Sequence, residues 1–136
     1  MKRFKWSALF SALAISLPTA AGAQSTPADQ AYLDDLYSFL ENQDSITYTM
    51  ATRGMSAEQN IWAAQMFCQT LSSGVDPLDA YAAYTSAAVD QASALGTALT
   101  DEMAYAVGLY GGAVMNLGAF HYCPQFQPQV SQALGE

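Results

Sequence analysis

The chain carries two cysteines, Cys68 and Cys123, behind an opening segment that is typical of export signals. Basic side chains within the first few positions precede an apolar run, and small residues then lead up to Ala23. This order predicts a secretory signal peptide over residues 1–23, with cleavage after Ala23. In an oxidising compartment an even number of cysteines favours pairing, so we expect a disulfide bond between Cys68 and Cys123.

The predicted signal segment lacks the features that would keep the mature protein in a membrane. Its apolar run, residues 6–17, covers about 12 residues, too few for a helix to cross a hydrocarbon layer of roughly 30 Å. Neither cysteine lies near the cleavage position, as a lipoprotein anchor would require. We therefore expect an exported protein, periplasmic or extracellular, without a stable membrane span in its mature form. Residues 24–28 would form a flexible leader and residues 29–136 a single helical domain.

Cleavage of the signal makes the charge strongly one-sided. The whole chain has 4 basic and 12 acidic residues, a formal net charge of −8. Three basic residues leave with the signal, so Arg53 alone opposes 12 carboxylates, which gives a net charge of −11. Nucleic acids are bound largely through lysine and arginine, so this composition argues against nucleic-acid binding. It also disfavours anionic lipid surfaces and favours a basic protein partner.

Capping residues divide the mature chain into four long helices. The predicted helices follow the caps Thr26, Ser56, Asp76 and Thr100 and end near Glu41, Gly74, Gly96 and Tyr122. Helical spacing assigns the core face of the first helix to Tyr32, Leu33, Leu36, Tyr37 and Leu40. It assigns that of the third to Leu78, Tyr81, Thr85, Ala88 and Val89. With a short turn at 130–134, the expected fold is all-α, a small bundle of four to five helices with one disulfide.

Residues 42–55 interrupt the helical pattern. Ile46, Tyr48 and Met50 alternate with threonines, which is the period of a strand. Because we find no partner strand in the sequence, we expect an extended loop whose apolar side chains cover the core.

Residues 103–120 contain no charged side chain, and Gly108 and Gly112 form a G-x-x-x-G pair within them. One interpretation is a membrane helix with a dimerisation face. The other is a buried central helix whose glycines let neighbouring helices approach closely. Asn116, the glycines and the absence of basic flanking residues favour the buried helix. Whether this segment contacts a membrane stays open at this stage.

The cysteines fall in the later part of the second predicted helix and at the end of the fourth. We expect the bond to join two antiparallel neighbours at one end. Closing a loop of about 55 residues is worth roughly 4 kcal/mol in the chain-entropy treatment. A redox-active pair is the alternative, but the C-x-x-C spacing and a basic neighbour that would lower a thiol pKa are both missing from the sequence. A structural bond is therefore the favoured interpretation.

Catalytic and metal-binding patterns are not recognised in the sequence. His121 is the single histidine, so a zinc site or a hydrolase triad would need companions that the motifs do not supply. The acidic pairs Asp34-Asp35 and Asp101-Glu102 point about 100° apart on a helix and suit capping and solvation. We expect Arg53 to pair with an acid or a helix C-terminus, and the alternative is that a single arginine in a loop anchors a partner. We predict no catalytic, cofactor-binding or metal site, and no enzymatic activity.

Three short motifs resemble those of a known family. Residues 68–74 read Cys-Gln-Thr-Leu-Ser-Ser-Gly, residues 122–124 read Tyr-Cys-Pro, and residues 32–36 read Tyr-Leu-Asp-Asp-Leu. With the alanine-rich helix between the first two, this pattern resembles the small exported bacterial proteins grouped as domain of unknown function 732. The resemblance covers most of residues 29–126. It implies a small exported helical domain with one disulfide and no established enzymatic activity.

Together these features predict a noncatalytic exported module that binds a protein or an envelope component. Two alternatives remain. One is an inhibitor or immunity-type protein for a secreted enzyme, because such proteins are often small, acidic and helical. The other is a small-ligand carrier with a cavity lined by tyrosines, methionines and Trp62. The sequence leaves the partner and the oligomeric state undetermined.

Overall fold

The computed structural model describes residues 25–135, and six α-helices account for most of this range, which contains no strand. In chain order the elements are α2 (Pro27–Gln43), α3 (Ser45–Thr49), the π-helix η2 (Met50–Gly54), α4 (Ala57–Ser72), α5 (Pro77–Ala94), α6 (Asp101–Tyr122), the 3-10 turn η3 (Pro124–Phe126) and α7 (Gln127–Ala133). The all-α class is confirmed, with more helices than the four to five predicted. The predicted signal peptide lies outside the described residues.

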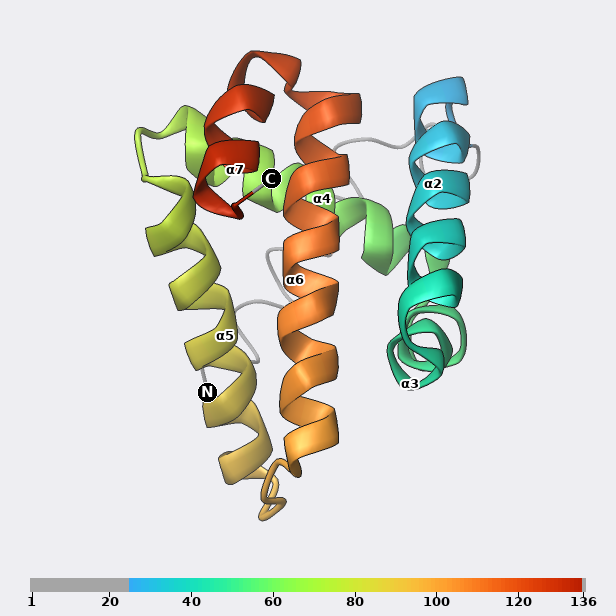
Figure 1. The fold of residues 1–136 in the computed structure, drawn as a ribbon, viewed down its shortest axis with the longest axis vertical. Coiled ribbons are helices and arrows are strands. Elements are labelled where there is room, and N and C mark those ends of the chain that lie inside the picture. Colours follow the sequence, from blue (N-terminus) through green and yellow to red (C-terminus); the bar gives the residue numbers. More distant parts are fainter. Residues whose placement is uncertain (1–24, 136) are drawn as a thin grey trace, which may run out of the picture.

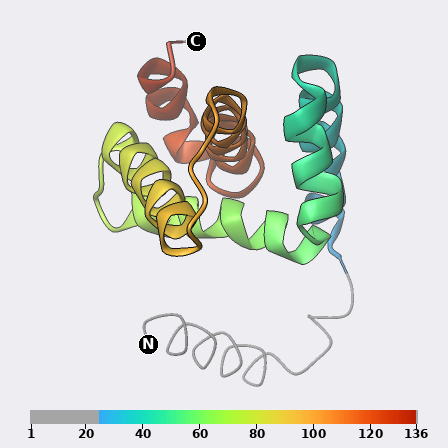
Figure 2. The same cartoon turned by 90° about the horizontal axis from the view of Figure 1, so that it is seen from below.

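The central element is α6, with α5 on one side and α2 on the other (Figure 1). Seen from below, α4 runs across the lower side of the helices, beneath α6, and α7 lies on the opposite side of the molecule beside α5 and α6 (Figure 2). The core is built mainly from residues of α2, α4 and α6. Because α4, α2 and α7 all pack against α6, its sequence decides how closely each of them can approach.

The predicted caps begin the helices as expected. Thr26 and Asp29 bond to each other's backbone N–H groups, and Ser56 and Gln59 form the same reciprocal box at α4. Asp76 and Thr100 cap α5 and α6. The first helix starts at Pro27, inside the segment assigned to a flexible leader. Gly74, with φ of +93°, follows the end of α4 in the left-handed conformation that glycine adopts most easily.

Two glycines of α6 explain how the neighbouring helices come so close. A Cβ at Gly118 would lie 2.9 Å from the Cβ of Ala64 in α4. At Gly111 it would overlap the ring of Tyr84 in α5. Each glycine costs about 0.5–1 kcal/mol in a helix interior, and here close packing offsets that cost. On the sides that meet α4 and α5, residues 103–120 therefore pack as the interpretation of a buried central helix expects.

The same helix keeps one face uncovered. By length and composition α6 is the single described helix that could cross a membrane, yet only 44% of its most apolar stretch is buried in the fold. A core helix of a soluble protein meets the same criteria. The exposed part of α6 is the starting point for the candidate site described below.

The disulfide joins α4 to the residue that follows α6. The sulfur atoms of Cys68 and Cys123 are bonded at 2.05 Å. The expectation that the two helices run antiparallel is wrong, because α4 crosses behind α6 (Figure 1, Figure 2). Gly118 permits this crossing by letting Ala64 reach the α6 backbone about one turn before the bond. The bond thus fixes a crossing point.

The extended loop predicted for residues 42–55 is also wrong, because this segment folds as α3 and η2. Asp44 starts α3 by accepting bonds from the Thr47 backbone N–H at 2.9 Å and the Thr47 hydroxyl at 2.6 Å. These two bonds lower the pKa of Asp44. As a result Thr47 is buried, whereas Ile46, expected to cover the core, is 43% exposed.

The predicted core face of α5 needs correction at both ends. Leu78 is 53% exposed and Val89 is 48% exposed, although the spacing assigned both to the core. The helix instead faces α6 with Ala80, Tyr81 and Tyr84. Tyr81, Thr85 and Ala88 of the predicted face are half-buried. The buried side of α5 is centred on the tyrosines that meet Gly108 and Gly111 of α6. The expected final turn is present as α7, which begins at Gln127 and buries Val130.

Candidate functional site

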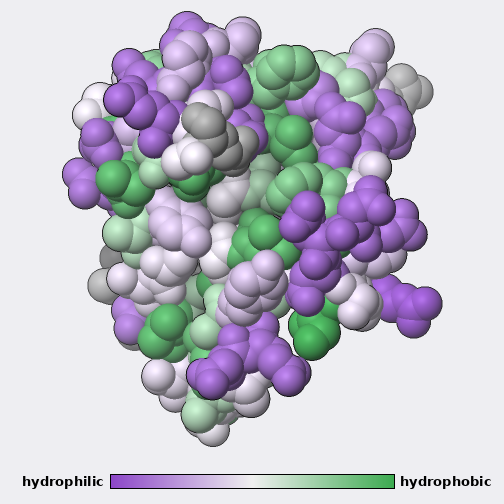
Figure 3. All heavy atoms as spheres, viewed as in Figure 1, coloured by the Kyte–Doolittle hydropathy of each residue, from purple (hydrophilic) through white to green (hydrophobic). Residues whose placement is uncertain are grey.

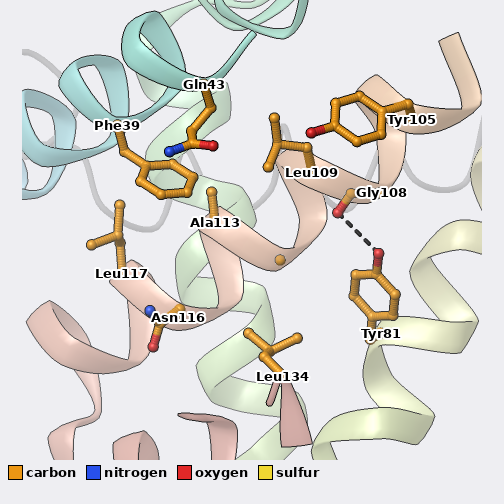
Figure 4. Close-up of a pocket in the computed structure, with 11 residues that line it drawn as sticks. Phe39, Gln43, Tyr81, Tyr105, Gly108, Leu109, Ala113, Asn116, Leu117 and Leu134 are labelled. Carbon is orange, nitrogen blue, oxygen red and sulfur yellow. Dashed lines mark hydrogen bonds between the residues drawn. The ribbon is translucent and has the colours of Figure 1, made fainter. Parts of the chain in front are cut away.

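An open groove of about 640 Å³ runs along the uncovered face of α6. Its lining comes from α2, α5 and α6 and from the residue that follows α7: Phe39, Gln43, Tyr81, Tyr105, Gly108, Leu109, Gly112, Ala113, Asn116, Leu117 and Leu134. Figure 4 shows Phe39 and Gln43 reaching over from α2, with Tyr81 and Leu134 on the other side of α6. We call this feature the α6 groove.

Seven lining residues belong to α6 and form the floor of the groove. They recur at helical spacing from Tyr105 to Leu117, so they share one face over three turns. At about 1.5 Å per residue this face is roughly 18 Å long. Tyr81 supports one end by donating a hydrogen bond from its hydroxyl to the carbonyl of Gly108 at 2.9 Å (Figure 4).

The α6 groove is apolar and uncharged. None of the described residues that line it is acidic or basic, and its polar side chains are two amides, Gln43 and Asn116, and two tyrosines. In the space-filling view, hydrophobic residues gather in the middle of this face and hydrophilic ones surround them (Figure 3). Burying such a surface is favourable by about 25 cal/mol per Å² of apolar area, so an apolar occupant would be stabilised here.

Gly112 sets the depth of the floor. A Cβ at this position would have no heavy atom within 4 Å, whereas its neighbour Gly111 is packed against Tyr84. Gly112 therefore leaves α6 backbone accessible in the middle of the groove. The sequence showed Gly108 and Gly112 as a pair but did not reveal that both face this groove.

A buried polar cluster around Asn60 joins α6 to neighbouring helices, and its members lie outside the lining of the α6 groove. Asn60 Oδ1 accepts a hydrogen bond from Tyr110 of α6 at 2.6 Å, and its Nδ2 donates to the carbonyl of Ala51 in η2 at 2.9 Å. Tyr37 Oη lies 3.2 Å from the same nitrogen, and Tyr32 donates to the Asn60 carbonyl at 3.0 Å. One side chain thus connects α2, η2, α4 and α6. Sequence analysis missed it because a single asparagine has no motif.

Burial keeps the tyrosines of this core neutral. Desolvation is the main cause that raises the pKa of Tyr32, Tyr84 and Tyr110 far above the ordinary value, and neighbouring tyrosines add to it. Their hydroxyls therefore serve as hydrogen-bond donors and packing groups. They are not suited to proton transfer near neutral pH.

The single histidine fastens the end of α6 to α2. His121 Nε2 lies 2.7 Å from Asp35 Oδ2, and the next residue, Tyr122, donates a hydrogen bond to Asp29. Burial and this contact with Asp29 raise the pKa of Tyr122. Among the described residues the His121–Asp35 contact is the one close approach of a basic side chain to a carboxylate, and it stands apart from the lining of the α6 groove. Its geometry indicates a connection between two helices.

The remaining predicted charged residues do not converge. Asp35 pairs with His121 while Asp34 is exposed, and Asp101 and Glu102 occupy the first turn of α6. Within residues 25–135, no three histidine, cysteine or acidic side chains gather closely enough to hold a metal ion. Arg53 lies in the last turn of η2 and forms no ion pair with the described residues, so its expected pairing stays a prediction.

Comparison with known proteins adds no relative: no family model, no curated protein and no solved structure matches this chain. The resemblance to the domain of unknown function 732 family therefore stays a prediction.

Proposed function

We propose that this protein is a noncatalytic exported module that binds a protein or an envelope component in the α6 groove. The observation that carries the proposal is the uncharged groove of about 640 Å³, lined from several helices and open on one face of α6. Its apolar floor and few polar groups are what binding sites commonly combine. The bonded cysteines are consistent with an oxidising compartment outside the cytoplasm.

A binding role fits the polar groups of the site better than a catalytic one. A hydrolase needs a nucleophile and a base in hydrogen-bonding reach of each other beside the bound substrate. In the groove the charge-free lining offers tyrosines and amides. His121 lies outside the groove, where it contacts Asp35 and joins α6 to α2.

A small-ligand carrier is the second candidate, and the volume of the groove favours it. Drug-sized ligands occupy sites of roughly 300–1,000 Å³, but they are usually 70–90% enclosed there. The α6 groove instead exposes its apolar lining along one face (Figure 3). Its lining includes tyrosines, as that alternative expected, but it includes neither Trp62 nor a methionine. An elongated occupant suits this shape better.

The proposed function can be tested with a neutral apolar dye and a variant that fills the groove. Nile red gains fluorescence when it enters an apolar site. Gly112→Leu places a side chain in open space on the floor, so it should block the groove and leave the fold intact. Gln65→Leu adds the same side chain to an exposed position of α4 and serves as the matched control.

We expect the wild-type protein and Gln65→Leu to bind the dye equally, and Gly112→Leu to lose most of the signal at a melting temperature no lower than that of the wild type. Equal dye binding by all three proteins would refute the groove as the binding site. A Gly112→Leu variant that loses helical circular dichroism would be replaced by Gly112→Val, which also narrows the floor.

A further inference from the structure

Gly112 is the one glycine of α6 without a close contact to a neighbouring helix. Gly111 and Gly118 allow Tyr84 and Ala64 to approach, and Gly108 is 3.0 Å from the Tyr81 hydroxyl when a Cβ is added. Gly112 has nothing within 4 Å, so within the described chain its helix-destabilising effect is uncompensated. A partner backbone packed against this point would supply the missing contact.

The surrounding floor has the shape that another helix needs. Tyr105, Leu109, Ala113 and Leu117 follow one another at four-residue intervals, with Gly108 and Gly112 beside them. Such a face offers ridges and a shallow depression into which the side chains of a second helix can interdigitate. Phe39 on α2 and Leu134 after α7 stand on opposite sides of it and would contact the flanks of that helix (Figure 4).

The negative charge of the molecule favours basic residues on the solvent-facing side of a helix bound in the groove. Arg53 is the one basic residue after the predicted signal, against 12 carboxylates, and Asp101 and Glu102 begin α6 about one turn before Tyr105. A helix in the groove would turn its outer face toward solvent within this negative field, where lysine and arginine are favoured. A second copy of this chain would bring the same negative charge and be repelled.

From the apolar floor, the open point at Gly112 and the charge, we infer that the α6 groove binds an amphipathic α-helix with a basic polar face, supplied by a different protein. This inference rests on the proposed function and specifies the partner of the same groove. Recognition of this kind uses apolar anchors at i, i+3, i+4 and i+7 for affinity. The charges increase the association rate and discriminate against acidic helices.

The test uses three synthetic peptides of about five helical turns, labelled for fluorescence anisotropy. The first carries leucine and alanine on one face and lysine on the other. The second keeps the apolar face and replaces every lysine with glutamate. The third has the composition of the first with its leucines scattered around the helix. Each is titrated with the oxidised exported protein, with Gly112→Leu and with Gln65→Leu.

We expect the lysine peptide to bind wild-type protein and Gln65→Leu, and the glutamate peptide to bind at least about tenfold more weakly. The scattered peptide and the Gly112→Leu protein should show little binding. Raising the salt concentration should weaken the lysine peptide without abolishing its binding, because the apolar contacts are not screened.

Several outcomes would overturn the inference. Equal binding of the lysine and scattered peptides would show charge attraction without groove recognition, and equal binding by Gly112→Leu would place the peptide elsewhere. A dimer that Gly112→Leu dissociates, measured by sedimentation, would make a second copy the occupant. Capture by phosphatidylcholine vesicles that Gly112→Leu abolishes would make it a lipid. If Nile red enters the groove but no peptide binds, the proposed function stands and this inference fails.

Discussion

The buried side chain of Asn60 offers the sharpest prediction about stability. Replacing it with leucine keeps the number and branching of the side-chain heavy atoms, with somewhat larger methyl groups, and removes both polar atoms. The Tyr110 hydroxyl loses its acceptor and the Ala51 carbonyl loses the Asn60 donor, and both residues are buried. Tyr32 keeps its partner, because it donates to the backbone carbonyl of residue 60.

The expected cost follows mainly from these two buried bonds, because the two others that Asn60 Nδ2 makes, to the Tyr37 hydroxyl and the Ser56 carbonyl, are only partly buried. A buried donor or acceptor without a partner costs about 1–3 kcal/mol, so we predict a loss of about 2–5 kcal/mol in the free energy of unfolding. A domain of this size has roughly 5–15 kcal/mol in total, so the variant should be folded but clearly weakened. Tyr110→Phe should cost less in the Asn60→Leu background than in the wild type, with a coupling of about 1–2 kcal/mol.

Urea unfolding followed by far-ultraviolet circular dichroism measures these values, with the disulfide intact in every variant. Asn42→Leu is the matched control, since Asn42 is exposed and bonds only to the Ser38 carbonyl of its own helix. We expect the control to change stability by less than about 0.5 kcal/mol. An Asn60→Leu variant as stable as this control would refute the role assigned to the cluster, as would purely additive effects with Tyr110→Phe.

Three further predictions concern packing, pH and the disulfide. Gly112→Ala should raise the free energy of unfolding by about 0.5–1 kcal/mol, because its new methyl group meets no other atom. Gly111→Ala should lower it, because its methyl group would overlap the ring of Tyr84. Equal shifts of the two variants in thermal unfolding would contradict this prediction. Burial raises the pKa of Tyr32, Tyr84 and Tyr110, so their contribution is complete below the ordinary pKa of 10.0 and is lost as pH rises above it. Absorbance at 295 nm should show these tyrosines ionising only as helical dichroism disappears, and ionisation in the folded protein would contradict the prediction. Reduction of the Cys68–Cys123 bond should cost about 2–5 kcal/mol and lower the melting temperature, and two free thiols in the exported protein would be the contrary result.

Local signals in the sequence located most helix ends. The caps at Thr26, Ser56, Asp76 and Thr100 act on their own neighbours, so the sequence alone is enough to find them. The prediction for residues 42–55 was wrong because the alternation of Ile46, Tyr48 and Met50 suggested an extended segment. The segment is helical because Asp44 caps α3 by accepting hydrogen bonds from the backbone and the hydroxyl of Thr47.

The remaining differences arise from tertiary contacts. Which side of α5 is buried depends on where Gly108 and Gly111 of α6 admit its tyrosines, and a helical period carries no such information. The α6 groove likewise combines Phe39, Tyr105 and Leu134, which are far apart in the chain. The sequence contains the uncharged segment 103–120 and its glycines Gly108 and Gly112, but it does not indicate that this side of the helix is exposed.

The location of the binding site is best measured by nuclear magnetic resonance. The lysine peptide would be titrated into isotope-labelled exported protein while backbone amide shifts are recorded. We predict that the largest changes fall on Gly108, Gly112 and Leu117 of α6 and on Phe39 of α2, and that Gly112→Leu removes them. Changes centred instead on the outer side of α5, around Ser86 and Val89, or spread evenly over the acidic surface, would contradict the α6 groove as the binding site.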